Sequence, residues 1–425
     1  MRNDAAERSA LAYIDAHRQE LYDLLLKLIG FDTENHGSTG REQACAEYIR
    51  GVYESLGLET ELYCPDEWLQ GHPDYLPGRD PAHRPNVGGV LRGSRGEKGL
   101  MLAAHIDTMP VGDRSLWRHD PFGAIEDGRI YGRGSGDDKC GIACGIFLAR
   151  MLRDLGIKLG RDLVLSAYCD EENGGGNGSI ASCIRYPCDM YINLDGGSGD
   201  REIWTCGIGG WVLKSRVRAR ETQDSAIAVV EGLNIVKDEV AVFGRRRSAE
   251  LQAHPYYRGT SLQRSALRVL TFKCGNAGMD LGEGCFDFVF YTTSDRAAIE
   301  NELRALEARI RGKLDPMGLD FGGFEPGSRY FDYIRADESD PSIQLLLECA
   351  AEANGRPVRA AGACLSDYFL YYKYGSPCSV TYGIFRDFSV PGGAHQPDEY
   401  ISCEDFLNMT KALALFILRW CGCEL

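Results

Sequence analysis

Short apolar runs that lead into acidic or histidine side chains limit most strongly what this chain can fold into. These runs cover 100–104, 163–168 and 190–194, and they lead into His105, Asp170-Glu171-Glu172 and Asp195. Apolar runs of this length between turn residues are typical of buried strands in a parallel sheet. Such sheets bind ligands outside the carboxyl ends of their strands. We therefore expect these side chains to face one crevice, which favours a metal site.

The order of the expected elements indicates an α/β fold with a mostly parallel sheet, because helical and strand patterns alternate as they do in βαβ units. In the first half of the chain, helices are expected at 7–30, 41–56, 141–155 and 178–186, and strands within 86–110 and at 162–169 and 190–195. The same style returns near the end, with helices at 341–354, 367–374 and 404–420 and a strand at 378–384.

The pattern between these parts is different and predicts a separate small domain. It comprises a strand at 211–218, a helix at 223–235, a polar stretch, strands near 266–273 and 285–292, and a helix at 299–314. This order indicates an α+β, ferredoxin-like domain inserted into the first one. A chain of 425 residues is also too long for one ordinary core. We expect a main domain made of 1–206 and 316–425, with 207–315 inserted.

Composition excludes several classes of partner. The net charge of −15 argues against a nucleic-acid surface, which needs clustered Lys and Arg. No apolar stretch reaches the roughly 18 residues of a membrane span. Residues 1–29 are charged throughout, with apolar residues at helical spacing, which predicts a surface amphipathic helix rather than a signal peptide. The sixteen cysteines are scattered through apolar runs, which favours reduced thiols and a cytoplasmic protein.

Two local strings suggest how metal ligands would be presented. In His105-Ile106-Asp107, residues two apart on a strand point to the same side, so Asp107 could accept the free N–H of a ligating His105. The alternative is a chance pair in a surface loop. In the glycine-rich segment 132–141, Asp137 stands just before a helix. The alternative there is a simple helix N-cap, for which Asp is a favoured residue.

The acidic string at 170–178 is the most informative one. Three adjacent acids repel one another unless a cation or a proton compensates. Neighbouring strand residues point to opposite sides. One of Glu171 and Glu172 could therefore hold a metal while the other serves as a base. The alternative is a solvated acidic turn, although the glycine run that follows opens room for a ligand.

Together these strings resemble the M20 family of co-catalytic zinc hydrolases, which includes acetylornithine deacetylase, succinyl-diaminopimelate desuccinylase, aminoacylases, carboxypeptidases and dipeptidases. The family pattern is His-x-Asp, Gly-Arg-Gly-x-x-Asp-x-Lys, Asp-Glu-Glu-x-Gly, a later acid at a strand end, and a late His. This chain has all five in order, at 105–107, 132–139, 170–174, Asp195 and 393–400. The resemblance spans roughly residues 10–420.

The resemblance implies two divalent ions, zinc first and cobalt or manganese as substitutes. It assigns Asp137 as the bridge between them, His105 and Asp195 to one ion, and Glu172 and His395 to the other. A hydroxide between the ions would attack an amide carbonyl.

The same resemblance implies roles for residues that do not bind metal. Glu171 would be the general base and acid. Asp107 would support His105, and a cis peptide would join Asp137 to Asp138. The inserted domain would be a lid or dimerisation domain on the catalytic domain.

The inserted domain departs from the family in one respect. Family members carry Gly-x-x-x-His there, and the matching stretch 217–224 has no histidine. His254 is either a displaced replacement or a surface histidine. Candidate substrate-binding residues are His254, Arg245 (in the cluster 245–247, either a solvated turn or an anion clamp), Arg329, Arg386, Ser366 and Asp367. The alternatives are ordinary surface arginines and, for Ser366-Asp367, a helix start.

These observations lead to three hypotheses. The first is hydrolysis of an amide bond in a small N-acyl amino acid. The second is a dipeptidase or carboxypeptidase of the same fold, and the third is a non-catalytic metal-binding protein. The expected partners are a small N-acyl amino acid or short peptide and, through the inserted domain, a second copy of the chain, with no nucleic acid and no membrane.

Overall fold

The computed structural model describes residues 3–220, 225–275 and 282–424. The chain forms two compact units, Met1–Thr205 with Arg335–Leu425, and Cys206–Ile334. The second unit continues past the expected boundary at residue 315, because β13 (Leu319–Pro326) pairs with β10 (Gly209–Ala219) of the same unit. That strand lies in a stretch for which the sequence pattern predicted no element.

A mixed nine-stranded sheet forms the centre of the larger unit. Eight strands follow one another across it in the order β1 (Glu59–Tyr63), β2 (Asn86–Leu91), β7 (Arg161–Tyr168), β3 (Glu97–His105), β8 (Met190–Asn193), β16 (Ser379–Thr381), β9 (Glu202–Gly207) and β14 (Ile334–Arg335). The ninth strand, β15 (Arg359–Ala363), pairs with β9.

The middle of this sheet is parallel, as the apolar runs predicted. β3 pairs in parallel with β7 on one side and with β8 on the other, and β8 pairs in parallel with β16. The carboxyl ends of these strands therefore meet at one edge of the sheet. His105 is the last residue of β3, and the segments that carry Glu172 and Asp195 leave β7 and β8 at that same edge.

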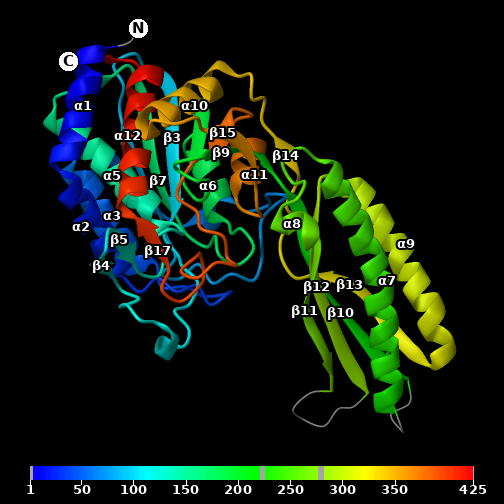
Figure 1. Ribbon diagram of the computed structural model, residues 1–425. Coiled ribbons are helices and arrows are strands. Elements are labelled where there is room, and N and C mark those ends of the chain that lie inside the picture. Colours follow the sequence, from blue (N-terminus) through cyan, green and yellow to red (C-terminus); the bar gives the residue numbers. More distant parts are fainter. Residues whose placement is uncertain (1–2, 221–224, 276–281, 425) are drawn as a thin grey trace. The chain divides into compact units, whose positions relative to one another are not determined.

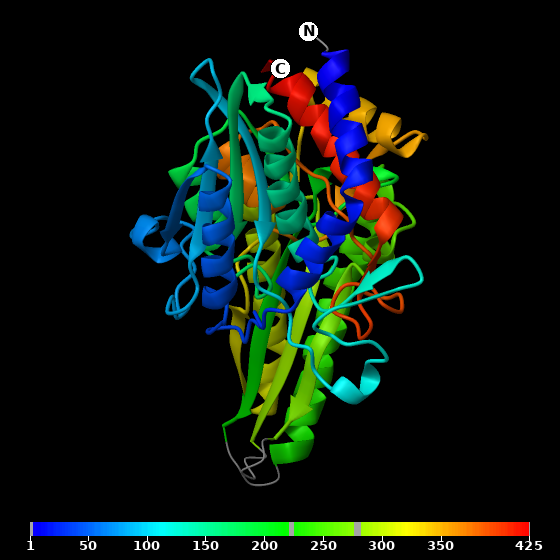
Figure 2. The ribbon, with the colours of Figure 1, turned by 90° about the vertical axis from the view of Figure 1, so that its left-hand side faces the viewer.

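Helices cover both faces of the sheet, so the larger unit has three layers (Figure 1). One face packs against α1 (Asp4–Ala16), α2 (Arg18–Ile29), α3 (Gln43–Ser55), α5 (Lys139–Asp154), α10 (Pro341–Asn354) and α12 (Cys403–Trp420). The other packs against α6 (Gly178–Arg185) and the segment formed by α11 (Tyr368–Leu370) and the π-helical turn η3 (Tyr371–Gly375). Figure 2 looks onto the first face, where the N-terminal helix α1 lies beside the C-terminal helix α12.

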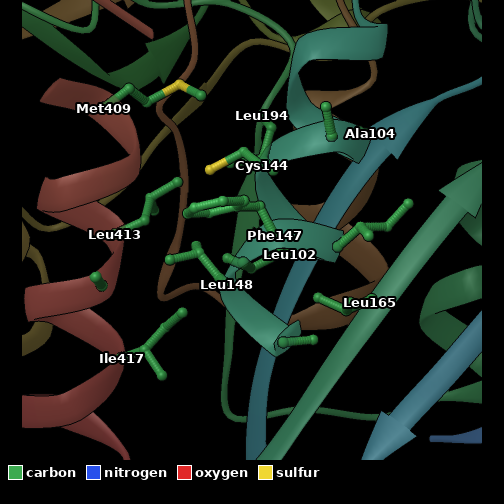
Figure 3. Close-up of a cluster of buried hydrophobic side chains, with 14 of the residues drawn as sticks. Leu102, Ala104, Cys144, Phe147, Leu148, Leu165, Leu194, Met409, Leu413 and Ile417 are labelled. Carbon is green, nitrogen blue, oxygen red and sulfur yellow. The ribbon is translucent and has the colours of Figure 1, made fainter. Parts of the chain in front are cut away.

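Alternating strand residues bury against the two helical layers. In β3, Leu102 and Ala104 face the α5 side, whereas Met101 and Ala103 face the α6 side. Figure 3 shows Phe147 of α5 between the strand residue Leu102 and side chains of α12. Because both faces are apolar, β3 is an unbroken hydrophobic run from Leu100 to Ala104, and the first polar side chain after that run is His105.

The smaller unit is a four-stranded antiparallel sheet with two long helices. Its chain order is β10, α7 (Ser225–Ala253), α8 (Ser261–Arg264), β11 (Leu267–Cys274), β12 (Glu283–Thr292), α9 (Arg296–Leu314), η2 (Asp315–Met317) and β13. The strands lie in the order β11-β12-β10-β13, and apolar residues of α7 and α9 pack on the sheet. A βαββαβ order with this sheet is the ferredoxin-like arrangement, so that prediction is confirmed.

Helix α7 is longer than the sequence pattern indicated. Part of the expected helix at 223–235 lies outside the described residues. The helix continues to Ala253, through the stretch that was expected only to be polar. The cluster 245–247 therefore lies on a helix and not in a turn. Arg247 is 5% exposed. Its Nη1 lies 2.9 Å from Glu250 Oε2, and its Nη2 lies 3.0 Å from Glu302 Oε1. Arg245, in contrast, is exposed.

Short elements complete the larger unit. They are α4 (Pro65–Trp68), η1 (Arg114–Leu116), a small sheet of β17 (Tyr400–Ser402), β5 (Arg129–Tyr131) and β4 (Ala124–Glu126), and the pair β18 (Cys423–Glu424) with β6 (Lys158–Leu159). The expected helix at 7–30 is two helices, α1 and α2, which meet at His17. Among the described helices, none is long and apolar enough to cross a membrane.

Candidate metal centre

Asp137 stands between two histidines that are far apart in the sequence. Its Oδ1 lies 2.9 Å from His105 Nε2, and its Oδ2 lies 3.2 Å from His395 Nε2. His395 Nε2 is also 2.8 Å from Glu172 Oε2. The two oxygens of one carboxylate thus face two different imidazoles, which is the arrangement expected of a carboxylate that bridges two ions.

Two overlapping groups of donor atoms could each hold an ion. One comprises His105, Asp137 and Glu172, the other His105, Glu171 and Asp195, and within each group the donor atoms all lie within 4.8 Å of one another. With the His395 contacts, the structure brings all five expected ligands and Glu171 together. Geometry alone leaves Glu171 as a possible ligand, because it stands in the second group.

His395 supplies a test of whether these residues fit a metal. Its Nε2 is buried and close to two carboxylates, yet within the described part of the chain it makes a directed hydrogen bond to neither. Atoms that bind one metal ion point towards the ion and not along a hydrogen bond to each other. The short contacts of His395 Nε2 without a directed hydrogen bond have this geometry. Nitrogen and oxygen donors of this kind suit zinc, cobalt or manganese.

The electrostatics of the crevice favour a bound cation. Burial raises the pKa of Glu171 well above its usual value, and the charges of Asp367 and Asp195 raise it further. Burial and the charge of Asp137 do the same for the pKa of Asp195. Burial alone would lower the pKa of His395, but the charges of Glu172 and Asp137 raise it to about 11. Divalent cations would reverse both effects, since they stabilise ionised carboxylates and neutral imidazoles.

Asp107 contacts the His105 ring through a different atom from the one that the strand spacing predicted. His105 Nδ1 lies 2.8 Å from the main-chain carbonyl oxygen of Asp107 and 3.6 Å from its carboxylate, so the carbonyl and not the carboxylate is the acceptor. The carboxylate instead accepts hydrogen bonds from the backbone N–H groups of Glu171 at 3.0 Å and Glu172 at 3.1 Å. Asp107 therefore holds the acidic loop that follows β7.

The loops that carry Asp137 and His395 are tied together by a buried ion pair. Arg133 Nη1 lies 2.5 Å from Glu399 Oε2, and both side chains are nearly inaccessible. Glu399 Oε1 accepts from the N–H groups of Gly134 and Gly136 at 3.1 Å each. The sequence motifs contained both residues without indicating that they pair, because a motif gives order along the chain and not contacts between loops.

The peptide bond between Asp137 and Asp138 is cis, as the resemblance implied.

The residues expected to bind substrate are distributed over both units. Ser366 and Asp367 are buried at the start of α11 in the larger unit, and the charge of Asp367 acts on Glu171. Arg386 Nε donates to the Gly392 carbonyl oxygen at 3.3 Å. Arg245, Arg329 and His254 lie in the smaller unit, where His254 Nε2 is 3.1 Å from the Tyr333 hydroxyl.

Full-length similarity connects the chain with deformylases. It is 27% identical over 439 residues to the N-formyl-4-amino-5-aminomethyl-2-methylpyrimidine deformylase of Bacillus subtilis, covering 96% of each chain. It is 24% identical to the protein of the same name from Halalkalibacterium halodurans, covering 97% of this chain and 96% of that one. A shorter match, 41% identical over 83 residues and 19% of this chain, is to a succinyl-diaminopimelate desuccinylase of Methylobacterium nodulans.

Solved structures share the fold. The dipeptidase Dug1p of Saccharomyces cerevisiae matches with a TM-score of 0.73 at 13% identity, covering 97% of this chain and 98% of that one. Human carnosine dipeptidase 1 matches with a TM-score of 0.69 at 17% identity, covering 97% and 99%. The sequence profile of peptidase family M20/M25/M40 matches residues 101–419, well over half of the chain, which confirms the resemblance. The chain is therefore a member of peptidase family M20/M25/M40.

Proposed function

We propose that this enzyme uses two divalent ions to hydrolyse the amide bond of a small N-acyl compound. The observation that carries the proposal is the carboxylate of Asp137, whose two oxygens face His105 at 2.9 Å and His395 at 3.2 Å. Such a carboxylate would bridge two ions. His105 and Asp195 would complete the shell of one ion, and Glu172 and His395 that of the other.

The ions would supply two effects when bound, polarisation of the amide carbonyl and a lowered pKa for the attacking water. Glu171 would accept a proton from that water at its carboxylate and pass it to the leaving nitrogen. Its backbone N–H is anchored on Asp107 Oδ1 at 3.0 Å, and Asp107 is not one of the proposed metal ligands. Its side chain lies beside His105 and Asp195, whereas Asp107 is completely buried and holds the loop.

A small acyl group on an amine is favoured over a peptide by the relatives that match along the whole chain. Both deformylases cover 96% of their own length in the match. The solved dipeptidases share the fold at 13% and 17% identity, which supports the architecture alone. An N-formyl aminopyrimidine is therefore the first substrate class to test, followed by N-acetyl and N-succinyl amino acids.

The experiment is a substrate panel on the purified enzyme with added zinc, cobalt or manganese. Release of free amine is measured for N-formyl aminopyrimidines, N-acyl amino acids and unblocked dipeptides, and bound metal is counted by elemental analysis. We expect two ions per chain and a larger kcat/KM for an N-acyl compound than for any dipeptide. A preference for dipeptides would support the peptidase alternative. Two bound ions without turnover of any class would contradict hydrolysis.

We also propose that the smaller unit mediates a homodimer. β11 is an edge strand, paired only with β12 among the described strands, and its Val269, Leu270 and Phe272 are 48%, 55% and 45% exposed. An exposed apolar edge strand is a template for pairing with another strand. A second copy of β11 is the expected partner. Sedimentation of the wild type against Phe272→Glu tests this, since a wild-type monomer would contradict it.

A further inference from the structure

A buried arginine lies behind the loop that carries Glu171 and Glu172. Arg84, in the segment just before β2, is 2% exposed. Its Nε donates to Glu42 Oε1 at 2.9 Å, and its Nη2 lies 2.9 Å from Asp170 Oδ1. Glu42 is fully buried. Loss of one member of such a buried pair is strongly destabilising because the other charge stays behind without compensation. Arg84 precedes β2, and Glu42 precedes α3. By pairing with both Glu42 and Asp170, Arg84 therefore fixes Asp170 relative to α3 and β2.

Asp170 is the residue at which the chain turns out of β7. Its φ is 65°, a left-handed conformation that is uncommon for residues with a side chain. His83, next to Arg84, has the same φ of 65°. The Asp170 carboxylate also lies 3.5 Å from Arg79 Nε, and Arg79 donates to the carbonyl oxygen of Asn173 in the same loop. Two guanidinium groups thus hold Asp170 in a backbone conformation that is uncommon for a residue with a side chain.

Asn35 links this ion pair to Asp107. Its Nδ2 donates to Asp107 Oδ2 at 2.7 Å and to Asp170 Oδ1 at 3.3 Å. The Asp107 carboxylate is the one that accepts the backbone N–H groups of Glu171 and Glu172. The acidic loop is therefore fixed on one side by Asp107 and at its first residue by Arg84, with Asn35 in contact with both anchors.

We propose that Arg84 is a positioning residue of the metal centre: through its buried pair with Asp170 it fixes the turn after β7 and so sets where the side chains of Glu171 and Glu172 point. The inference rests on the proposed function, because it takes Glu172 as a metal ligand and Glu171 as the base. Arg84 itself touches neither of them. It acts only through the loop, so its loss changes the geometry of the site without removing a donor atom.

The test compares Arg84→Gln, Arg84→Lys and Asp170→Asn with the wild type. Asn keeps the shape of Asp170 and tolerates the left-handed conformation, and Lys keeps the charge but cannot present two nitrogens to two carboxylates. Zinc affinity is measured by competition with a chromophoric chelator, and ligand geometry by the visible absorption of the cobalt-loaded protein. Arg92→Gln is the matched control, because Arg92 also pairs with two carboxylates, Glu59 and Asp162, but is 59% exposed.

We expect Arg84→Gln and Asp170→Asn each to weaken zinc binding about 10–100-fold, as loss of a group that orients metal ligands does. The cobalt spectrum and kcat should change with them, while Arg92→Gln stays at wild type. Since both residues act through one pair, the double variant should lose less than the product of the two single effects. Arg84→Lys should fall between wild type and Arg84→Gln.

The outcomes separate this inference from the proposed function. Folded Arg84→Gln and Asp170→Asn proteins with wild-type zinc affinity and cobalt spectrum would overturn the positioning role alone. A wild type that binds no pair of ions would overturn both. If Arg84→Gln does not fold, Asp170→Asn carries the test, since the buried Arg84 keeps its ion pair with Glu42 in that variant.

Discussion

Replacing Glu171 with Gln separates its two possible roles, base and ligand. The substitution keeps the size of the side chain and removes its charge and its ability to accept a proton. The backbone N–H at this position stays on Asp107 Oδ1, and Glu172 Oε1 stays on the Met109 N–H at 2.8 Å, because neither bond involves the altered side chain. We therefore expect the loop and the Glu172 carboxylate to remain in place.

The expected loss lies in the chemical step. General acid–base catalysis contributes about 10²–10⁴-fold, which is about 3–5 kcal/mol of the barrier. The variant should retain two ions per chain. Burial and the nearby charges of Asp367 and Asp195 raise the pKa of Glu171, so its carboxylate is disfavoured in the protein without metal. Removing that charge should leave the metal-free protein no less stable than the wild type.

Three measurements on one preparation decide whether Glu171 is the base or a metal ligand. They are bound metal by elemental analysis, kcat and KM on the preferred N-acyl substrate, and the denaturant midpoint of the metal-free protein. We expect two ions, a fall in kcat of two to four decades with KM nearly unchanged, and an equal or higher midpoint. Turnover within a factor of ten of the wild type would refute the role as base. A variant with one ion would instead make Glu171 a ligand, as its place beside His105 and Asp195 permits.

Three further outcomes follow from the structure. Asp137→Ala should lose both ions, because its two oxygens face both histidines; two ions per chain by elemental analysis would contradict the bridge. Phe147→Ala should lower the free energy of unfolding by about 3–5 kcal/mol, since Phe147 is fully buried, and a denaturant midpoint within error of the wild type would contradict this. Removing the metals with a chelator should lower the thermal midpoint, because ions that bind only the folded state stabilise it; an unchanged midpoint in calorimetry would show that the site contributes nothing to stability.

The sequence was sufficient to predict the site residues that lie at the ends of strands. A strand buried on both faces is apolar throughout, so the first polar residue at its end is conspicuous, and His105, the acids after β7 and Asp195 were found in this way. The order of the motifs then located Asp137 and His395. Both depend on contacts between loops, which spacing along the chain does not specify.

The sequence did not predict which atoms contact each other between loops, nor where some helices and strands begin and end. Asp107 was expected to hold the His105 ring through its carboxylate, but the carbonyl of the same residue has that contact. Both atoms belong to one residue, so residue spacing cannot separate them. Helix α7 was predicted too short because a helix in a two-layer unit exposes a wide polar face, on which Arg245 lies. β13 was missed because two adjacent glycines, Gly322 and Gly323, interrupt the alternation of apolar and polar side chains in the sequence of the strand.

The two halves of the candidate centre are held by different means, and this accounts for where its buried charges lie. His105 is part of β3 itself, and the loop with Glu171 and Glu172 leaves the neighbouring strand, so hydrogen bonding within the sheet already brings them close. Asp137 and His395 belong to loops that adjoin the paired strands β5 and β17 of the small sheet, and a buried ion pair, Arg133 with Glu399, adds to that pairing. The Arg84–Asp170 pair stands where a strand ends and the chain must turn sharply. In each half, a buried arginine therefore stands where the chain leaves paired strands to carry a ligand.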